Sequence, residues 1–139
     1  MNVHALVPAA GSGSRLDGDT RKQYLELGGQ PVLVRTLVRL AALPQVTAIH
    51  RIVPEEDVAF CRNELVERYH LDKIGAVIVG GAERQDSVRN GLEACGAENQ
   101  DVILVHDGVR PFFPQDQIGP LVQLAAVEGA ALLAVPAQD

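Results

Sequence analysis

Short apolar runs alternate with stretches of helical periodicity along the whole chain. The runs are continuous and rich in β-branched residues, which predicts strands that are buried on both faces of a sheet. We expect five such strands, over residues 3–7, 46–53, 76–79, 102–105 and 131–135. Between them, apolar residues recur at three- and four-residue steps, as in amphipathic helices. This alternation predicts an α/β fold, with a mostly parallel sheet and helices on both faces.

Prolines and glycines set the ends of the expected helices. These helices begin near Pro31, Pro54, Ser87 and Pro114. Proline suits a first helical turn because its missing N–H is not needed there. Gly28-Gly29 marks a turn before the first helix, and Pro44 ends that helix. A chain of 139 residues with this pattern is expected to form one domain, over residues 1–139.

Three of the expected strands are followed by loops with unusual residues. The loops run from Pro8 to Arg15, from Gly80 to Arg84, and from His106 to Pro111. In open parallel sheets, ligands bind outside the carboxyl ends of the strands. Because these ends share one edge of the sheet, the three loops together predict a binding site there.

The first loop predicts a phosphate site. Its small residues let backbone N–H groups approach an anion closely. These small residues are Ala9, Ala10, Gly11 and Gly13, and Pro8 precedes them. Arg15, Arg21 and Lys22 supply positive charge nearby, but Leu16 stands where a dinucleotide fingerprint has its third glycine. A glycine-rich turn with solvated basic residues therefore remains an alternative interpretation.

The second loop predicts contacts to a flat polar ligand. Gly80 and Gly81, followed by Ala82, can form a tight turn or can leave backbone groups open to the edge of a base. Asp86 and Ser87 lie in the first turn of the next helix, where either can cap the helix. Ser87 could also reach a ribose hydroxyl.

The third loop contains the carboxylate best placed for chemistry, Asp107. It can close an Asx turn on its own backbone, or it can be an oxygen ligand for Mg²⁺. Arg110 is expected to pair with a carboxylate or to position Asp107, and His106 to be a core histidine or a base. The other histidines are expected to be structural and to form no cluster: His4, His50 and His70.

Composition narrows the classes of function. The net charge of −6 argues against a general binder of nucleic acids or membrane surfaces. No apolar run reaches the roughly 20 residues of a membrane span, and the N-terminus has no secretory pattern. Cys61 and Cys95 lack partners at metal-ligand spacing, so we expect buried, reduced thiols in a cytoplasmic protein. A phosphate cradle, cations and a metal-capable aspartate, without a nucleophile–base pair, favour transfer of a nucleotidyl group.

Four motif blocks, in this order, resemble those of a known enzyme family: PAAGSGSRL, RKQYLELGGQPVL, GGAERQDSV and VHDGVRP. The family is that of the 2-C-methyl-D-erythritol 4-phosphate cytidylyltransferases, and the resemblance covers essentially the whole chain. It implies a Rossmann-like nucleotidyltransferase domain, CTP and Mg²⁺ as requirements, and a homodimer. The implied reaction transfers CMP from CTP to methylerythritol phosphate and releases pyrophosphate, in non-mevalonate isoprenoid biosynthesis.

The resemblance also implies roles for individual residues. The loop from Pro8 to Gly13 would hold the base and triphosphate of CTP. Arg15 and Lys22 would be catalytic, because they would stabilise the charge that builds on the α-phosphate. The segment from Gly80 to Ala82 would contact cytosine, with Ser87 beside it.

Asp107 has a less definite role in this comparison, since it would face the metal, the ribose or the second substrate.

Ala82 stands where some relatives carry an acidic residue, so a base contact there must use the backbone. The family continues beyond the position of Asp139 into a dimerisation arm and a C-terminal segment, whose threonine, arginine and lysine grip the second substrate. We therefore expect that the chain is truncated.

Several alternatives remain open at this point. A related cytidylyltransferase acting on a pentitol phosphate, such as ribitol 5-phosphate, would share the glycine-rich loop and the block around Asp107. A non-catalytic nucleotide-binding module would share the fold. A preference for GTP would instead indicate a guanylyltransferase.

Overall fold

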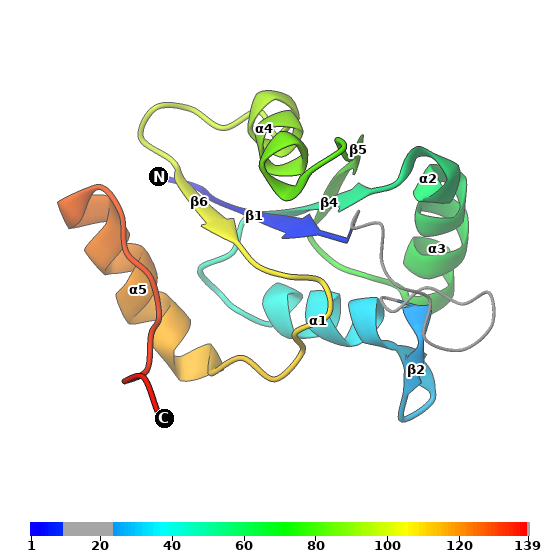
Figure 1. Ribbon diagram of the computed structural model, residues 1–139, viewed down its shortest axis with the longest axis horizontal. Helices are drawn as coiled ribbons and strands as arrows, with labels where there is room; N and C mark the ends of the chain where they lie inside the picture. The colour runs from blue at the N-terminus through cyan, green and yellow to red at the C-terminus, as the bar shows by residue number, and fades with distance from the viewer. Residues whose placement is uncertain (10–23, 139) are drawn as a thin grey trace.

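A computed structural model describes residues 1–9 and 24–138 of the chain (Figure 1). Four parallel strands form the central sheet: β1 (Val3–Pro8), β4 (Ala48–Val53), β5 (Ile74–Val79) and β6 (Val102–Val105). Their order in the sheet is β5-β4-β1-β6. The chain therefore builds outward from β1 on one side and then crosses to the other side for β6. The strand order reverses between β1 and β6, and the predicted parallel α/β sheet is confirmed for these strands.

The longer helices of the described residues are α1 (Val32–Ala41), α4 (Arg84–Ala94) and α5 (Gln115–Glu128). As predicted, α1 follows Pro31 and α5 follows Pro114. A small hairpin of β2 (Glu26–Leu27) and β3 (Gln30–Pro31) encloses the predicted Gly28-Gly29 turn. Figure 1 shows α4 on one face of the sheet and α1 on the other, with α5 beside β6.

The helical segment after β4 is irregular. It consists of a 3₁₀ turn (Glu55–Asp57), α2 (Val58–Phe60), a π-helical turn (Cys61–Leu65) and α3 (Val66–Tyr69). The predicted helix after Pro54 thus exists, but not as one continuous α-helix. Tyr24 packs against it: its hydroxyl donates to Asp57 Oδ2 at 2.9 Å and lies 3.4 Å from Cys61 Sγ. Cys61 and Cys95 are both free and buried, as predicted.

Alternation along β1 assigns its side chains to two cores on opposite faces of the sheet. Val3, Ala5 and Val7 belong to the larger core, which α1 and α5 complete. Leu6 belongs to the smaller core, on the α4 face. The other members of that smaller core are Ile52, Ile78 and Cys95. Full burial of each Leu, Ile or Val side chain contributes about 1.5–3 kcal/mol, so both faces stabilise the sheet.

The predicted fifth strand over residues 131–135 is wrong. Residues 130–138 form no strand, and β6 remains at the edge of the sheet. Ala131, Leu132 and Leu133 instead line an apolar groove with residues of β6 and α5, and the C-terminal segment runs back along α5 (Figure 1). The run pairs with no strand, and its side chains stay largely exposed, with Leu132 at 78% and Val135 at 87%. Two other strands begin two residues away from the prediction, β4 at Ala48 and β5 at Ile74.

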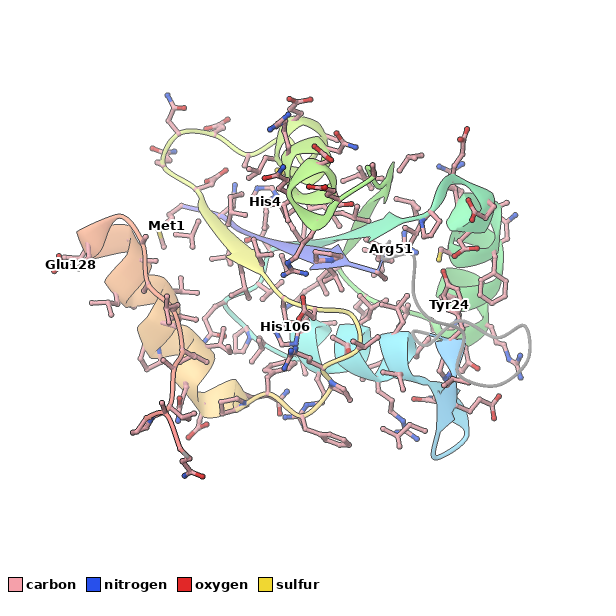
Figure 2. All side chains as sticks on the ribbon, viewed as in Figure 1. Met1, His4, Tyr24, Arg51, His106 and Glu128 are labelled. Atoms are coloured by element: carbon pink, nitrogen blue, oxygen red, sulfur yellow. The ribbon has the colours of Figure 1, made fainter. Side chains whose placement is uncertain are left out.

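The prediction that the histidines form no cluster is wrong for His4 and His50. Their rings stack with centroids 5.4 Å apart, and His4 Nδ1 lies 3.1 Å from His50 Nε2. The Ala76 N–H donates to His50 Nδ1 at 3.1 Å, so neutral His50 carries its proton on Nε2, facing His4. His4 Nε2 in turn lies 3.4 Å from Asp101 Oδ2. Figure 2 shows His4 between β1 and α4, on the face opposite α1.

None of the described helices combines the length and the apolar character that crossing a membrane would require.

Candidate functional site

The carboxyl ends of β1, β5 and β6 share one edge of the sheet, as predicted. Main-chain hydrogen bonds continue past the strands and fix the start of each loop. Donor first, they run from Ala9 N–H to Ile52 O (2.7 Å), from Gly80 N–H to Val53 O (2.8 Å), and from Gly108 N–H to Pro8 O (3.1 Å). Segments far apart in the sequence are therefore brought together at this edge.

Gly108 is the point where the first and third loops touch. A Cβ at this position would lie 2.9 Å from Leu33 Cδ1, 3.2 Å from Ala9 Cβ and 3.3 Å from Pro8 O. Only glycine allows so close an approach without displacing its neighbours. The contact falls between β1 and β6, where the strand order reverses. In open α/β sheets this switch point opens the crevice in which ligands bind.

Asp107 lies between two arginines. Arg84 Nη1 forms an ion pair with Oδ1 at 2.5 Å, and Arg110 Nε donates to Oδ2 at 2.8 Å. Arg84 begins α4, so this pair joins the second loop to the third. The predicted pairing of Arg110 with a carboxylate is confirmed, and the Asp107 side chain does not merely close a turn.

The charge of this group suits an anion. Burial raises the pKa of Asp107, but the hydrogen bond from Arg110 and the charge of Arg84 outweigh it and hold the pKa below the ordinary 3.8. The carboxylate is therefore ionised at neutral pH. Asp107 and its two arginines together carry a charge of +1, in a chain whose net charge is −6, and the acidic side chains of Glu83 and Asp86 lie beside Arg84 at the start of α4.

Gly81 is held against the first turn of α4. Its N–H donates to Ser87 Oγ at 3.0 Å, and a Cβ on Gly81 would overlap Asp86 Cβ. Ser87 is 3% exposed, so it supports this loop from behind rather than lining an open surface. Asp86, not Ser87, completes the cap, since its Oδ2 accepts the Glu83 N–H at 3.2 Å. Gly80, Gly81 and Ala82 thus lie together at the edge, as predicted.

His106 has a structural role in this arrangement. Its Nε2–H donates to the Arg110 carbonyl at 2.7 Å, and its ring packs edge-on against Phe113 at 4.7 Å between centroids. Figure 2 shows His106 between the end of β6 and α1.

Two residues that the sequence did not single out belong to the site. Arg84 is the ion-pair partner of Asp107, and Thr36 of α1 donates its hydroxyl proton to the Gly108 carbonyl at 2.8 Å. The only signal for Arg84 in the sequence is its place in the loop after β5, at the edge where β6 also ends. Thr36 carries no signal beyond being a polar residue on an otherwise apolar helix face.

Some of the predicted site residues lie outside the residues that the structure describes. They are Ala10, Gly11, Gly13, Arg15 and Lys22.

The predicted magnesium role of Asp107 fits its surroundings poorly. Both carboxylate oxygens already face guanidinium groups, which would repel a divalent cation. In the described part of the chain, no three His, Cys, Asp or Glu side chains form a group that could hold a metal. The group around Asp107 is arranged for an anion.

The parallel sheet, the helices on both its faces and the reversal of strand order define a doubly wound α/β protein. In such proteins ligands bind at the edge where the strand order reverses. Residues 3–139 match the sequence profile of IspD, 2-C-methyl-D-erythritol 4-phosphate cytidylyltransferase. The chain belongs to this family.

Individual relatives agree with this assignment. The 2-C-methyl-D-erythritol 4-phosphate cytidylyltransferases of Geotalea uraniireducens and Geobacter metallireducens are each 48% identical to the chain over its full length. The chain spans 60% and 61% of their lengths. A crystal structure of the enzyme from Francisella tularensis has a TM-score of 0.71 at 33% identity, covering 90% of this chain and 52% of that one.

Proposed function

We propose that the complete protein is a cytidylyltransferase that transfers CMP from CTP to 2-C-methyl-D-erythritol 4-phosphate and releases pyrophosphate. The observation that carries this proposal is the match of residues 3–139 to the family. Pro8 and Ala9, the second loop and the third loop lie at one edge of the sheet in the described residues, which supports the proposal independently. Both relatives named above bear this activity in their names.

The reaction requires positioning and charge stabilisation more than covalent catalysis. A phosphate oxygen of the alcohol phosphate forms a bond to the α-phosphorus of CTP. The bond from that phosphorus to the bridging oxygen breaks, and pyrophosphate leaves with its electron pair. Arg15 and Lys22, both outside the described residues, would stabilise the charge that builds on the α-phosphate. This role comes from the sequence.

The described residues would hold the two substrates around this reaction. The backbone of Gly80 to Ala82 would face the cytosine edge, and Ser87 would keep Gly81 in place through its hydrogen bond. Pro8 and Ala9 would begin the wall of the phosphate cradle. Asp107 would orient Arg110 and Arg84 toward the ribose or the phosphate of the second substrate.

Magnesium would fit this scheme as a companion of the nucleotide. It prefers phosphate and water oxygens and commonly binds with few protein ligands. Because Asp107 is paired with arginines, we assign no described residue as its ligand. When bound, the ion would neutralise phosphate charge.

We also propose a homodimer in a reducing, cytoplasmic setting. The dimer is what family membership implies. The two buried free thiols suit a reducing compartment.

Pyrophosphate release by the complete protein tests the proposed function. We expect turnover with CTP, Mg²⁺ and methylerythritol phosphate, and much less with ATP or GTP. Arg15→Ala and Lys22→Ala should each lower kcat by about a hundredfold or more while the fold survives, because such cations act mainly in the transition state. Near-normal kcat in either variant would remove that residue from the mechanism.

The same assay separates the alternatives. Faster turnover with ribitol 5-phosphate would identify a pentitol phosphate enzyme. Binding of CTP in calorimetry without pyrophosphate release would favour a nucleotide-binding module.

A further inference from the structure

We propose that Thr36 of α1 is a positioning residue for the reaction, acting on Asp107 and Arg110 through the main chain of Gly108. This proposal rests on the proposed function. Thr36 lies on α1 and not in one of the loops at the sheet edge. Its hydroxyl contacts the loop after β6 at the Gly108 carbonyl.

Main-chain hydrogen bonds to β1 fix the start of the loop after β6, and side chains add further contacts along it. Three of its carbonyls each accept a hydrogen bond from a side chain. The donors are Thr36 Oγ1 to Gly108 O (2.8 Å), His106 Nε2 to Arg110 O (2.7 Å), and Arg39 Nη2 to Phe113 O (2.8 Å). Two of the three donors come from α1, so this helix determines where the loop lies.

Thr36 is the polar exception on the buried face of α1. The side chain is 0% exposed, and the remaining buried residues of the helix are apolar. Its hydroxyl has one proton. The contact to Val32 O within the helix is 3.2 Å, whereas the contact to Gly108 O is 2.8 Å, so the proton is directed to the loop. The buried Thr36 hydroxyl therefore donates to the neighbouring loop rather than to its own helix, and this hydrogen bond holds the loop in place.

Gly108 transmits this contact to the site. Its carbonyl is held by Thr36 and its N–H by Pro8 O at 3.1 Å. On the inner side it has no free space, because Leu33 and Ala9 lie at contact distance. Without the hydroxyl, the Gly108 carbonyl would lose its side-chain partner, and the peptide would be free to shift. Asp107, the preceding residue, would move with it.

Kinetics and hydrogen exchange on the complete protein test the proposal. Thr36→Val keeps the shape of the side chain and removes the donor. We expect kcat/KM to fall about tenfold, the order of change that one buried hydrogen bond supports. Thr36→Ser restores the hydroxyl and should restore most of the rate. The amides of Gly108 and Arg110 should exchange faster in Thr36→Val than in the wild type.

Thr47→Val is the matched control. It removes a hydroxyl that accepts the Val3 N–H at 3.0 Å, at the opposite end of β1 from the site. It should leave kcat/KM and the exchange of the loop unchanged, even where it lowers stability. A loss of kcat/KM as large in Thr47→Val would reduce the Thr36 effect to general destabilisation and overturn the proposal.

A double variant adds a second criterion. If Thr36 acts through Asp107, adding Thr36→Val to Asp107→Asn should cost little beyond Asp107→Asn alone. Fully additive losses would overturn the proposal. If the wild-type protein releases no pyrophosphate, the proposed function fails, whereas the exchange of Gly108 and Arg110 still decides whether Thr36 fixes the loop.

Discussion

We expect the ion pair of Arg84 and Asp107 to matter little for stability and more for the proposed reaction. The Arg84 side chain is 59% exposed, and ion pairs at such positions contribute about 0–1 kcal/mol. We expect Arg84→Gln to change the free energy of unfolding by less than about 1 kcal/mol. Because Asp107 would keep only one of its two cations, kcat/KM should fall about tenfold. Chemical denaturation and pyrophosphate release measure the two quantities.

Arg89→Gln provides the control for this prediction, since Arg89 is an exposed arginine of the same helix. It should leave both the stability and the rate unchanged. A large loss of stability in Arg84→Gln at an unchanged rate would assign the pair to the fold instead of the site.

His50 makes a prediction about pH. Burial, the neighbouring His4 and the charge of Arg51 lower the pKa of His50 below 6.5. The unfolded chain then takes up a proton at a higher pH than the folded chain does. Stability should therefore fall as the pH drops below 6.5, by at most about 1.4 kcal/mol per pH unit for this one group. Thermal unfolding of the complete protein, measured from about pH 7 to pH 5, follows this loss.

Asparagine at position 50 tests the assignment, because its side-chain oxygen can still accept the Ala76 N–H. His50→Asn should flatten the slope of stability against pH in this window. His70→Asn changes an exposed histidine and should leave the slope as it is. An unchanged slope in a stable His50→Asn protein would assign the acid sensitivity to another group.

At the scale of whole elements, the sequence predicts what depends on local pattern. Continuous apolar runs identified β1, β4, β5 and β6, and prolines marked the starts of α1 and α5. The run at residues 131–135 is also apolar, but only Val135 among its five residues is β-branched, and apolar character alone does not decide whether a segment pairs with the edge of a sheet. The π-helical turn at Cys61–Leu65 is likewise invisible to a three- and four-residue repeat.

The same distinction separates the predicted from the unpredicted parts of the site. Arg110 lies three residues from Asp107, so their pairing follows from local spacing. Arg84 meets Asp107 only because β5 and β6 end at the same edge, and His4 meets His50 only through the register of β1 against β4. The hydrophobic pattern and the residue spacing of the sequence do not predict contacts that depend on strand order and register.

The larger core contains residues of β1, α1, α5 and the helical segment after β4. Because Cys61 belongs to this core, the reactivity of its thiol measures how often the core opens. Cys61 is 0% exposed, its carbonyl accepts a hydrogen bond from the buried Arg51, and burial raises the pKa of its thiol despite the nearby Tyr24 and Arg51. The reactive thiolate is therefore both rare and inaccessible. In a Cys95→Ser background, modification of Cys61 by a disulfide reagent should be at least about a thousandfold slower than in denaturant, as opening of a stable core requires.

Labelling of Cys61 should then follow the loss of the whole fold. Across a urea titration, the labelled fraction and the far-ultraviolet circular dichroism should change together, because Cys61 packs against the same core as β1 and α1. Labelling that precedes the spectroscopic transition would show that the irregular segment from α2 to α3 opens separately. In that case the contacts of Tyr24 with Asp57 and Cys61 would be lost before the strands part.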